Sequence, residues 1–436
     1  MNRFGEGEHH MNRILKKKSS WGLKKYPVGI YNYLNLKDHG THMTEAEMQS
    51  LADAGVTVPQ GPSFDPNDPA QKAHMLKMLD WAAARDMKII LWDPRCMGKC
   101  EKNGQPPADY AEGVKAAVKD FGEHPGVFGF FIGDEPSYEV MESFAACQRI
   151  QKEIAPHLHS VLNHEGAMGS GRDKYLDRFA ELSDADVMSY DCYLQMQNPA
   201  VNRVWGIDRY FENLRIYREA SLRNGIPFWN TVICIGHWMY SCPNLDEIRW
   251  QFNTSVAAGA SGVSWFHWYL PKPILNYRLP PIDEFWEKTQ TYYDIRRVQQ
   301  NFHRTYGDLF NRLVSTRVSF HQFALGHGSS DWSPNELVSG IETQHGQNTP
   351  ILVGEFTDGE GGRYVMFVNN SQTKDACDHV KIKFPKNVKL YVYDYGSEGK
   401  EQPAGNYEGP RLEGDHLRDW RWLAPGQEAV YRVEIV

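Results

Sequence analysis

Short apolar runs alternate with helix-like segments eight times along roughly the first 300 residues of the chain. The runs have strand length and lack a polar face, which is typical of buried parallel strands. They occupy residues 26–31, 55–59, 87–95, 127–134, 159–165, 185–191, 227–233 and 262–268. The helical segments occupy residues 44–54, 68–85, 110–121, 139–154, 173–182, 205–224, 246–258 and 284–304.

This alternation predicts an α/β fold, a (β/α)₈ TIM barrel over residues 21–310. A doubly wound open sheet is the alternative, but it would need a glycine-rich phosphate-binding turn after an early strand, and the sequence has none. In a barrel the functional side chains come from the C-terminal ends of the strands. The polar residues at the ends of the runs are therefore the candidates for a site.

The character of the chain changes after the predicted barrel. Runs at residues 362–371, 380–384, 389–393 and 428–434 are short and alternating, and turns rich in Gly, Asn and Asp separate them. This pattern predicts a small all-β sandwich over residues 318–436 with an accessory role. Residues 1–20 are polar and basic and repeat Met-Asn-Arg at 1–3 and 11–13, so we expect them to be disordered or of vector origin.

Composition excludes several classes of protein. The net charge of -8 gives no basic field for nucleic acid, no stretch approaches a membrane span, and the seven scattered cysteines imply no disulfide framework. No signal peptide is visible, so we expect a secreted or periplasmic protein if a leader was removed and a cytoplasmic one otherwise. The 13 Trp and 22 Tyr suit a protein that stacks on sugar rings, although large cores also use them.

The fourth run ends in Asp134, Glu135 and Pro136. Proline stops the ladder of strand hydrogen bonds, which leaves two adjacent carboxyl groups at the mouth of a buried strand. A desolvated carboxyl group tends to stay protonated, and a general acid needs that property. We therefore predict that Glu135 is a general acid and that Asp134 orients it or binds a sugar hydroxyl.

The motif Gly133-Asp134-Glu135-Pro136 resembles the Asn-Glu-Pro of the large clan of (β/α)₈ glycoside hydrolases that place the acid/base glutamate at the end of strand four. Residues 259–268 are similar to the eighth strand of that clan, where an aromatic residue commonly floors the sugar subsite. The C-terminal β-sandwich is also similar to that of many such enzymes. The resemblance implies a hydrolase that cleaves a glycosidic bond in a poly- or oligosaccharide, with a carbohydrate substrate and without a metal or organic cofactor.

The seventh run departs from this pattern. Retaining members carry a nucleophilic glutamate there, whereas residues 228–237 contain no carboxylate and the nearest acids, Asp246 and Glu247, open the following helix. Asp191, at the end of the sixth run, is the preferred second carboxylate over Glu165 and Asp93. With Asp191, we expect a wide gap between the two carboxyl groups and an inverting mechanism.

Further strand-end residues are predicted to bind substrate, although buried tryptophans also serve packing and lone histidines are commonly core groups. The predicted substrate-binding residues are Tyr31, Asp93, Asp134, His164, Glu165, Trp229, Asn230, His237, Trp265, His267 and Trp268. Two alternatives stay open. One is a metal-dependent barrel hydrolase that draws on the acids and histidines of this set, and the other is a non-catalytic carbohydrate-binding barrel.

Overall fold

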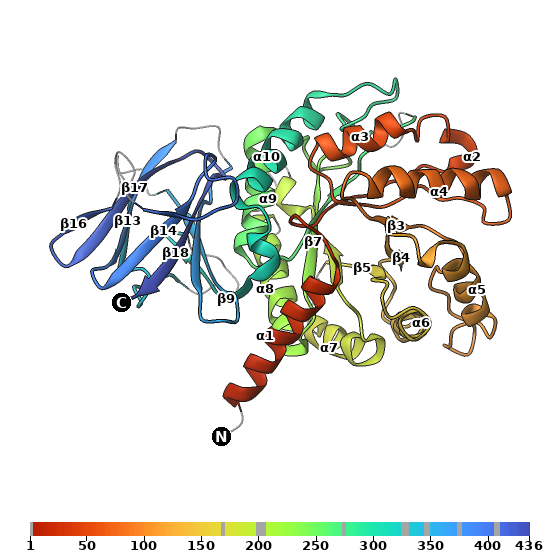
Figure 1. The fold of residues 1–436 in the computed structure, drawn as a ribbon, viewed down its shortest axis with the longest axis horizontal. Coiled ribbons are helices and arrows are strands. Elements are labelled where there is room, and N and C mark those ends of the chain that lie inside the picture. Colours follow the sequence, from red (N-terminus) through yellow and green to blue (C-terminus); the bar gives the residue numbers. More distant parts are fainter. Residues whose placement is uncertain are drawn as a thin grey trace.

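The structure is a computed structural model in which a parallel barrel is followed by antiparallel sheets (Figure 1). It describes residues 3–166, 171–197, 206–272, 276–323, 331–343, 349–372, 377–404 and 410–436. The first residue of the predicted helix 205–224, and residues 1 and 2, lie outside these ranges.

Eight parallel strands form the barrel in the order β2-β1-β8-β7-β6-β5-β4-β3. They are β1 (Val28–Ile30), β2 (Val58–Pro59), β3 (Ile89–Leu91), β4 (Val127–Asp134), β5 (Val161–His164), β6 (Met188–Asp191), β7 (Phe228–Ile233) and β8 (Val263–Phe266). β2 and β3, the two ends of this order, also meet. Gln60 and Ile90 form a parallel β-bridge, and the Gly61 N–H donates to the Ile90 carbonyl. The predicted barrel is therefore confirmed.

Helices follow the strands as expected and cover the outside of the barrel (Figure 1). They are α2 (Leu36–His39), α3 (Glu45–Asp53), α4 (Pro69–Ala83), α5 (Tyr110–Ala117), α6 (Met141–Ile154), α7 (Arg172–Ser183), α8 (Ile207–Asn224), α9 (Leu245–Ala257) and α10 (Gln290–Tyr306). Asp68 and Asn244 cap α4 and α9 through their side chains. The last helix begins at Gln290 rather than at residue 284, because the Asp283 carboxylate accepts from the N–H groups of Phe285 and Glu287 in a turn.

Side chains alternate between the inside of the barrel and the helical layer, with the period of two that a strand imposes. Ile90, Val161 and Ser189 point inward and line a small internal cavity. Their neighbours in sequence point outward: Tyr190 stacks on Tyr217 of α8 with ring centroids 3.9 Å apart. This alternation decides which strand-end side chain can reach a site at the centre of the barrel.

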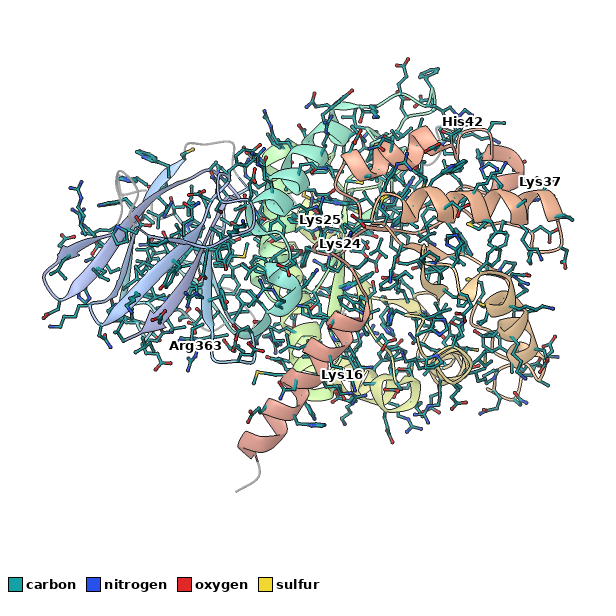
Figure 2. All side chains as sticks on the ribbon, in the orientation of Figure 1. Lys16, Lys24, Lys25, Lys37, His42 and Arg363 are labelled. Carbon is teal, nitrogen blue, oxygen red and sulfur yellow. The ribbon has the colours of Figure 1, made fainter. Side chains whose placement is uncertain are left out.

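An additional helix, α1 (Arg3–Ser20), precedes the barrel, so the expected disorder is wrong for residues 3–20. The Trp21 side chain, which follows α1, is 1% exposed and packs against Phe128 and Trp229 inside the barrel. The buried Lys18 ammonium donates to the carbonyl groups of Phe310 and Leu313, both at 2.7 Å. These partners lie more than 100 residues away, so the polar composition of the segment does not reveal them. Lys16 of α1, and Lys24 and Lys25 after it, are exposed (Figure 2).

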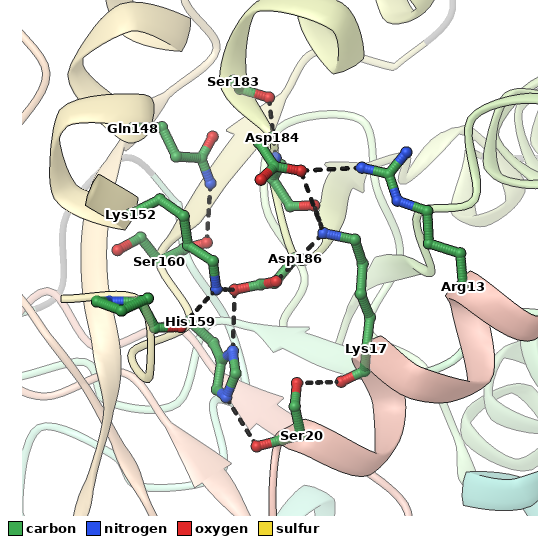
Figure 3. A network of polar contacts seen from close by, with 12 residues as sticks. Arg13, Lys17, Ser20, Gln148, Lys152, His159, Ser160, Ser183, Asp184 and Asp186 are labelled. Atoms are coloured by element: carbon green, nitrogen blue, oxygen red, sulfur yellow. Dashed lines mark hydrogen bonds and ion pairs between the residues drawn. The ribbon is translucent and has the colours of Figure 1, made fainter. Parts of the chain in front are cut away.

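Asp186, on the loop before β6, holds α1 against the barrel (Figure 3). Its carboxylate is 5% exposed and accepts from Lys152 at 2.6 Å, from the His159 ring at 2.9 Å and from Lys17 of α1 at 3.3 Å. Burial opposes ionisation of Asp186, but the His159 hydrogen bond and the two ammonium charges outweigh it and lower the pKa of this carboxyl group. The neighbouring Asp184 contacts Arg13 of α1 from a more exposed position.

The C-terminal residues form two antiparallel sheets with a shared apolar core, which confirms the predicted β domain. One sheet contains β10 (Gly340–Thr343), β13 (Asp378–Pro385), β17 (His416–Leu423) and β16 (Arg411–Glu413). The other contains β15 (Gln402–Pro403), β14 (Val388–Tyr393), β18 (Glu428–Ile435), β12 (Arg363–Asn369), β11 (Ile351–Thr357) and β9 (Val314–His321). The domain packs on α9, where the Trp250 indole donates to the Asn370 side chain at 2.8 Å. Within the described residues, no helix is long and apolar enough to cross a membrane.

We expect Asp186→Asn to lower the free energy of unfolding by about 3 kcal/mol, because it leaves Lys17 and Lys152 without their buried counter-charge. Denaturant titration at neutral pH would measure the loss. The matched change Asp184→Asn removes an exposed pair and should cost below about 1 kcal/mol. Because the folded-state pKa of Asp186 is lowered, its contribution is present above the unfolded pKa of about 3.9 and is lost as the pH falls below that value. Equal losses in both variants would contradict this assignment.

Candidate active site

A cavity of about 320 Å³ opens at the C-terminal ends of the barrel strands. Four carboxyl groups line it: Asp134 and Glu135 at the end of β4, Glu165 just after β5, and Asp191 at the end of β6. The remaining lining residues among those described are Tyr33, Gly166, Cys192, Tyr193, Leu194, Asn213, His237, Trp238, Tyr240, Phe266 and Tyr277. The structure therefore brings the predicted pair Glu135 and Asp191 together at one pocket.

Glu135 and Asp191 are joined by a hydrogen bond between their carboxyl groups. Burial raises the pKa of Asp191 well above its ordinary value, and the nearby charges of Glu135 and Asp134 raise it further. Burial also raises the pKa of Glu135, although its side chain opens into the pocket. Two carboxylates in such contact cannot both be ionised without repulsion, so the pair holds one proton, and Asp191 is the stronger holder.

Glu135 has an unusual backbone. Its φ of 42° lies in the left-handed region, which a residue with a side chain rarely adopts and which costs on the order of 1 kcal/mol. The Glu135 N–H donates to the Asn163 carbonyl of β5 at 2.9 Å, and Pro136 follows directly. The abrupt end of β4 thus places the Glu135 side chain beside the end of β6.

Asn163 of β5 organises the carboxyl groups. Its side-chain N–H₂ donates to Asp134 at 2.9 Å and to Asp191 at 3.3 Å. The Tyr193 hydroxyl also donates to Asp191, and this hydrogen bond opposes the rise in the pKa of Asp191. Glu165 has a different environment, because it forms an ion pair with Arg172 of α7 at 3.3 Å.

Aromatic rings form the other walls of the pocket, and His237 lies among them. The ring centroid of His237 is 5.0 Å from that of Tyr277 and 5.5 Å from that of Phe266. The His237 side chain is 3% exposed, and within the described part of the chain neither ring nitrogen has a hydrogen-bond partner. Burial lowers the pKa of His237, with Arg278 adding to the effect, so the ring stays neutral. Unpaired buried nitrogens at a pocket wall are available to a ligand.

Three predicted binding residues do not line this pocket and contact the helical layer or a neighbouring arginine instead. Asp93 is buried outside the barrel and accepts from the Arg95 guanidinium through both carboxylate oxygens. His164 contacts the Tyr175 hydroxyl of α7 at 3.1 Å, and burial lowers its pKa to about 3. Asn230 donates to Ser255 of α9 at 2.9 Å. His164 and Asn230 occupy outward positions on β5 and β7, and Asp93 follows the end of β3.

The predicted aromatic binding residues, and His267, do not line the pocket either. Trp229 points into the barrel but contacts Trp21 below the site, and Trp265 and Trp268 are buried against α10. Tyr31 is buried under the pocket with its ring 6.2 Å from Phe131, and His267 packs behind Tyr33 and Tyr277. The aromatic lining instead comes from residues that we did not predict: Tyr33, Tyr193, Trp238, Tyr240, Phe266 and Tyr277.

Strand parity could have found some of the missed residues. Asn163 and Phe266 occupy inward positions of β5 and β8, one residue away from the predicted His164, Trp265 and His267. Tyr193, Trp238, Tyr240 and Tyr277 lie on loops, where no periodicity applies.

The seventh strand lies at the predicted place, and no carboxylate from it lines the described pocket. Asp246 pairs with Arg249, and Glu247 belongs to the capping box of α9 with Asn244. Glu135 and Asp191 lie in hydrogen-bond contact instead of across the expected wide gap, which leaves no room for a water molecule between them in this structure. Of the proposed metal ligands, Glu165, Asp191 and His237 line this pocket, whereas Asp93, His164 and His267 do not. Among the described residues, no three His, Cys, Asp or Glu side chains are placed so that they could hold a metal ion together.

No protein-family model and no curated protein matches the sequence. Solved structures share the fold. One described as a glycoside hydrolase aligns with a TM-score of 0.57 and 13% identity over 94% of this chain and 92% of its own. A glycoside hydrolase family 5 protein from Bacteroides vulgatus aligns with a TM-score of 0.57 and 14% identity over 94% of this chain and 89% of its own. A beta-galactosidase from Marinomonas ef1 aligns with a TM-score of 0.47 and 14% identity over 63% of this chain. The alignment covers 59% of the length of that protein. The chain is thus similar in fold to barrel glycoside hydrolases that carry a C-terminal β domain.

Proposed function

We propose that this protein hydrolyses a glycosidic bond, with Glu135 and Asp191 as the catalytic pair. The observation that carries the proposal is the hydrogen-bonded carboxyl pair at the end of β4 and β6, in a pocket with aromatic walls. Glycoside hydrolysis needs two carboxyl groups, one protonated and one ionised, and a pair that shares one proton supplies both. The similarity in fold to glycoside hydrolases supports this class of reaction.

The environments of the two groups divide their roles. Glu135 opens into the pocket, so it can reach the oxygen of an incoming glycosidic bond, whereas Asp191 lies deeper and accepts from Asn163 and Tyr193. A sugar that enters between them breaks their hydrogen bond. The shared proton, held mainly by Asp191 in the free protein, then passes to Glu135, because the hydrogen bonds from Asn163 and Tyr193 stabilise the ionised form of Asp191. The Glu135 proton then passes to the leaving oxygen as its bond to the anomeric carbon breaks, and the ionised Asp191 bonds to that carbon.

Water completes the reaction. Glu135, now ionised, takes a proton from a water molecule that attacks the anomeric carbon, and the bond to Asp191 breaks. Two displacements at the same carbon retain its configuration. Carboxyl groups that start in contact need to part only to ~5–5.5 Å for this route, whereas a single displacement needs them ~6.5–9.5 Å apart with a water molecule between them.

Glu135→Gln and Asp191→Asn should each lower kcat/KM by about 10³-fold or more with the fold intact, because each removes one half of the pair. Initial rates on a panel of aryl glycosides would measure the loss, and circular dichroism would check the fold. Glu139→Gln, an exposed glutamate on the same loop that does not line the pocket, is the matched control and should retain full activity. A fully active Glu135→Gln enzyme would exclude the proposed acid, and wild-type protein that binds glycosides without turnover would indicate a binding barrel.

We expect the first product released from an active glycoside to keep the anomeric configuration of the substrate. Proton NMR of the early reaction mixture distinguishes the two anomers before mutarotation. An inverted product would show that Asp191 is not the nucleophile, even if both variants above are inactive.

Tyr193→Phe should move the alkaline limb of the pH profile of kcat/KM to higher pH. The Tyr193 hydroxyl stabilises the ionised form of Asp191, so its loss raises the pKa of Asp191 further, and the singly protonated pair then persists to higher pH. Tyr240→Phe changes a hydroxyl in the same pocket that does not bond to the pair and should leave the limb in place. A shift toward lower pH in Tyr193→Phe would contradict this account.

A further inference from the structure

We propose that the pocket takes a sugar with a free amino group, a 2-amino-2-deoxyglycoside, and that Asp134 binds its ammonium group. The assignment of the ammonium to the carbon beside the scissile bond rests on the function proposed above. The preference for a cationic sugar rests on the residues of the pocket alone.

The charges of the pocket favour a cation. Four carboxyl groups converge in a cavity of about 320 Å³, and no Lys or Arg is among its described lining residues. Two guanidinium groups act on pocket residues, and both are engaged: Arg172 pairs with Glu165, and Arg278 donates to the main-chain oxygens of Asn276 and Tyr240. With one proton shared by Glu135 and Asp191, the pocket keeps a net negative charge. An anionic sugar such as a uronate or a sulfated glycan would meet repulsion there.

Asp134 is the carboxylate whose charge is not balanced. It accepts from the Asn163 side chain, but within the described residues it forms no ion pair. The protein around it displaces water, and this burial raises the pKa of Asp134 even though the side chain opens into the pocket. An ammonium group from the ligand would supply the missing counter-charge and donate hydrogen bonds to the free oxygen positions of Asp134.

The walls provide a second and independent reason. Six aromatic rings surround the carboxyl groups, and a cation over such rings gains electrostatic stabilisation from their faces. His237 lies among these rings with both ring nitrogens unpaired within the described chain, and its neutral ring can accept a hydrogen bond from a donor of the ligand. A neutral hydroxyl could also use His237, but only a cation uses the carboxylates, the rings and the histidine together.

The position of Asp134 indicates where the amino group lies. Asp134 is adjacent to Glu135 in the chain, and the same Asn163 amide donates to both Asp134 and Asp191. A group bound by Asp134 therefore lies next to the carbon that the pair attacks, which places it on C2 of the sugar. An acetamido group at C2 is larger and carries no charge, so it can neither balance the charge of Asp134 nor act as a cation over the rings.

Binding of methyl glycosides tests the proposal without turnover. Wild-type protein should bind methyl 2-amino-2-deoxyglycosides at least tenfold more tightly than the matched 2-hydroxy and 2-acetamido glycosides of the same configuration, measured by calorimetry at pH 6 in low salt. The preference should shrink as salt is added, because it is electrostatic. Equal or weaker binding of the amino sugar would overturn the proposal.

The isosteric variant Asp134→Asn separates Asp134 from the other acids. It should bring the preference for the amino sugar over the matched 2-hydroxy glycoside below about threefold. Asp173→Asn, which removes an exposed carboxylate of α7 that does not line the pocket, should leave the preference intact. An unchanged preference in Asp134→Asn would show that another group binds the cation.

Aryl glycosides distinguish failure of this proposal from failure of the proposed hydrolase. Turnover of 2-hydroxy glycosides that depends on Glu135, with no advantage for the amino sugar, would preserve the hydrolase and reject the amino-sugar assignment. Tight and Asp134-dependent binding of the amino sugar without turnover of any glycoside would preserve the binding assignment and reject the hydrolase.

Discussion

Closure of the eight parallel strands is the constraint on which the rest of this structure depends. In a closed barrel every side chain of a strand points either into the interior or into the helical layer, and neighbours in sequence take opposite directions. The inward rows of β5 and β6 end in Asn163 and Asp191, which meet Glu135 at the end of β4. The outward rows hold the helices, through contacts such as that of Asn230 with Ser255. Site and scaffold thus occupy alternate positions of the same strands.

The same convergence creates an electrostatic problem. Carboxyl groups that meet at the centre of the barrel lose water and repel one another, so they retain a proton well above the ordinary pKa of a carboxyl group. Asn163 and Tyr193 donate hydrogen bonds to Asp191 and reduce this repulsion without removing it. Asp186 shows the reverse case. Two ammonium groups and a histidine contact this buried carboxylate and keep it ionised. Nearby charge therefore makes one buried acid a proton holder and another a structural anchor.

Much of the fold was predictable because it follows from local pattern. The apolar runs and capped helices identify the barrel, and the proline after Glu135 marks the end of β4. The candidate pair was also predictable, since Glu135 and Asp191 both end buried strands. The residues that do not reach the pocket have one main physical feature in common: His164 and Trp265 also lie at the ends of buried strands, but they occupy outward positions. The helix α1 was missed because its buried partners, such as Phe310 for Lys18, are remote in sequence.

By itself, the sequence determined that this chain forms a parallel barrel followed by a β domain. It also determined that carboxylates end two of the barrel strands. Both results come from hydrophobic periodicity and from strand-breaking prolines, which act on residues close to them in the sequence. Only the tertiary structure decided which of those polar side chains share a pocket, that Glu135 and Asp191 share a hydrogen bond, and that loop aromatics rather than strand tryptophans form its walls. The physical reason is that desolvation, charge repulsion and ring contacts depend on distances across the barrel, and those distances exist only once all the strands have come together.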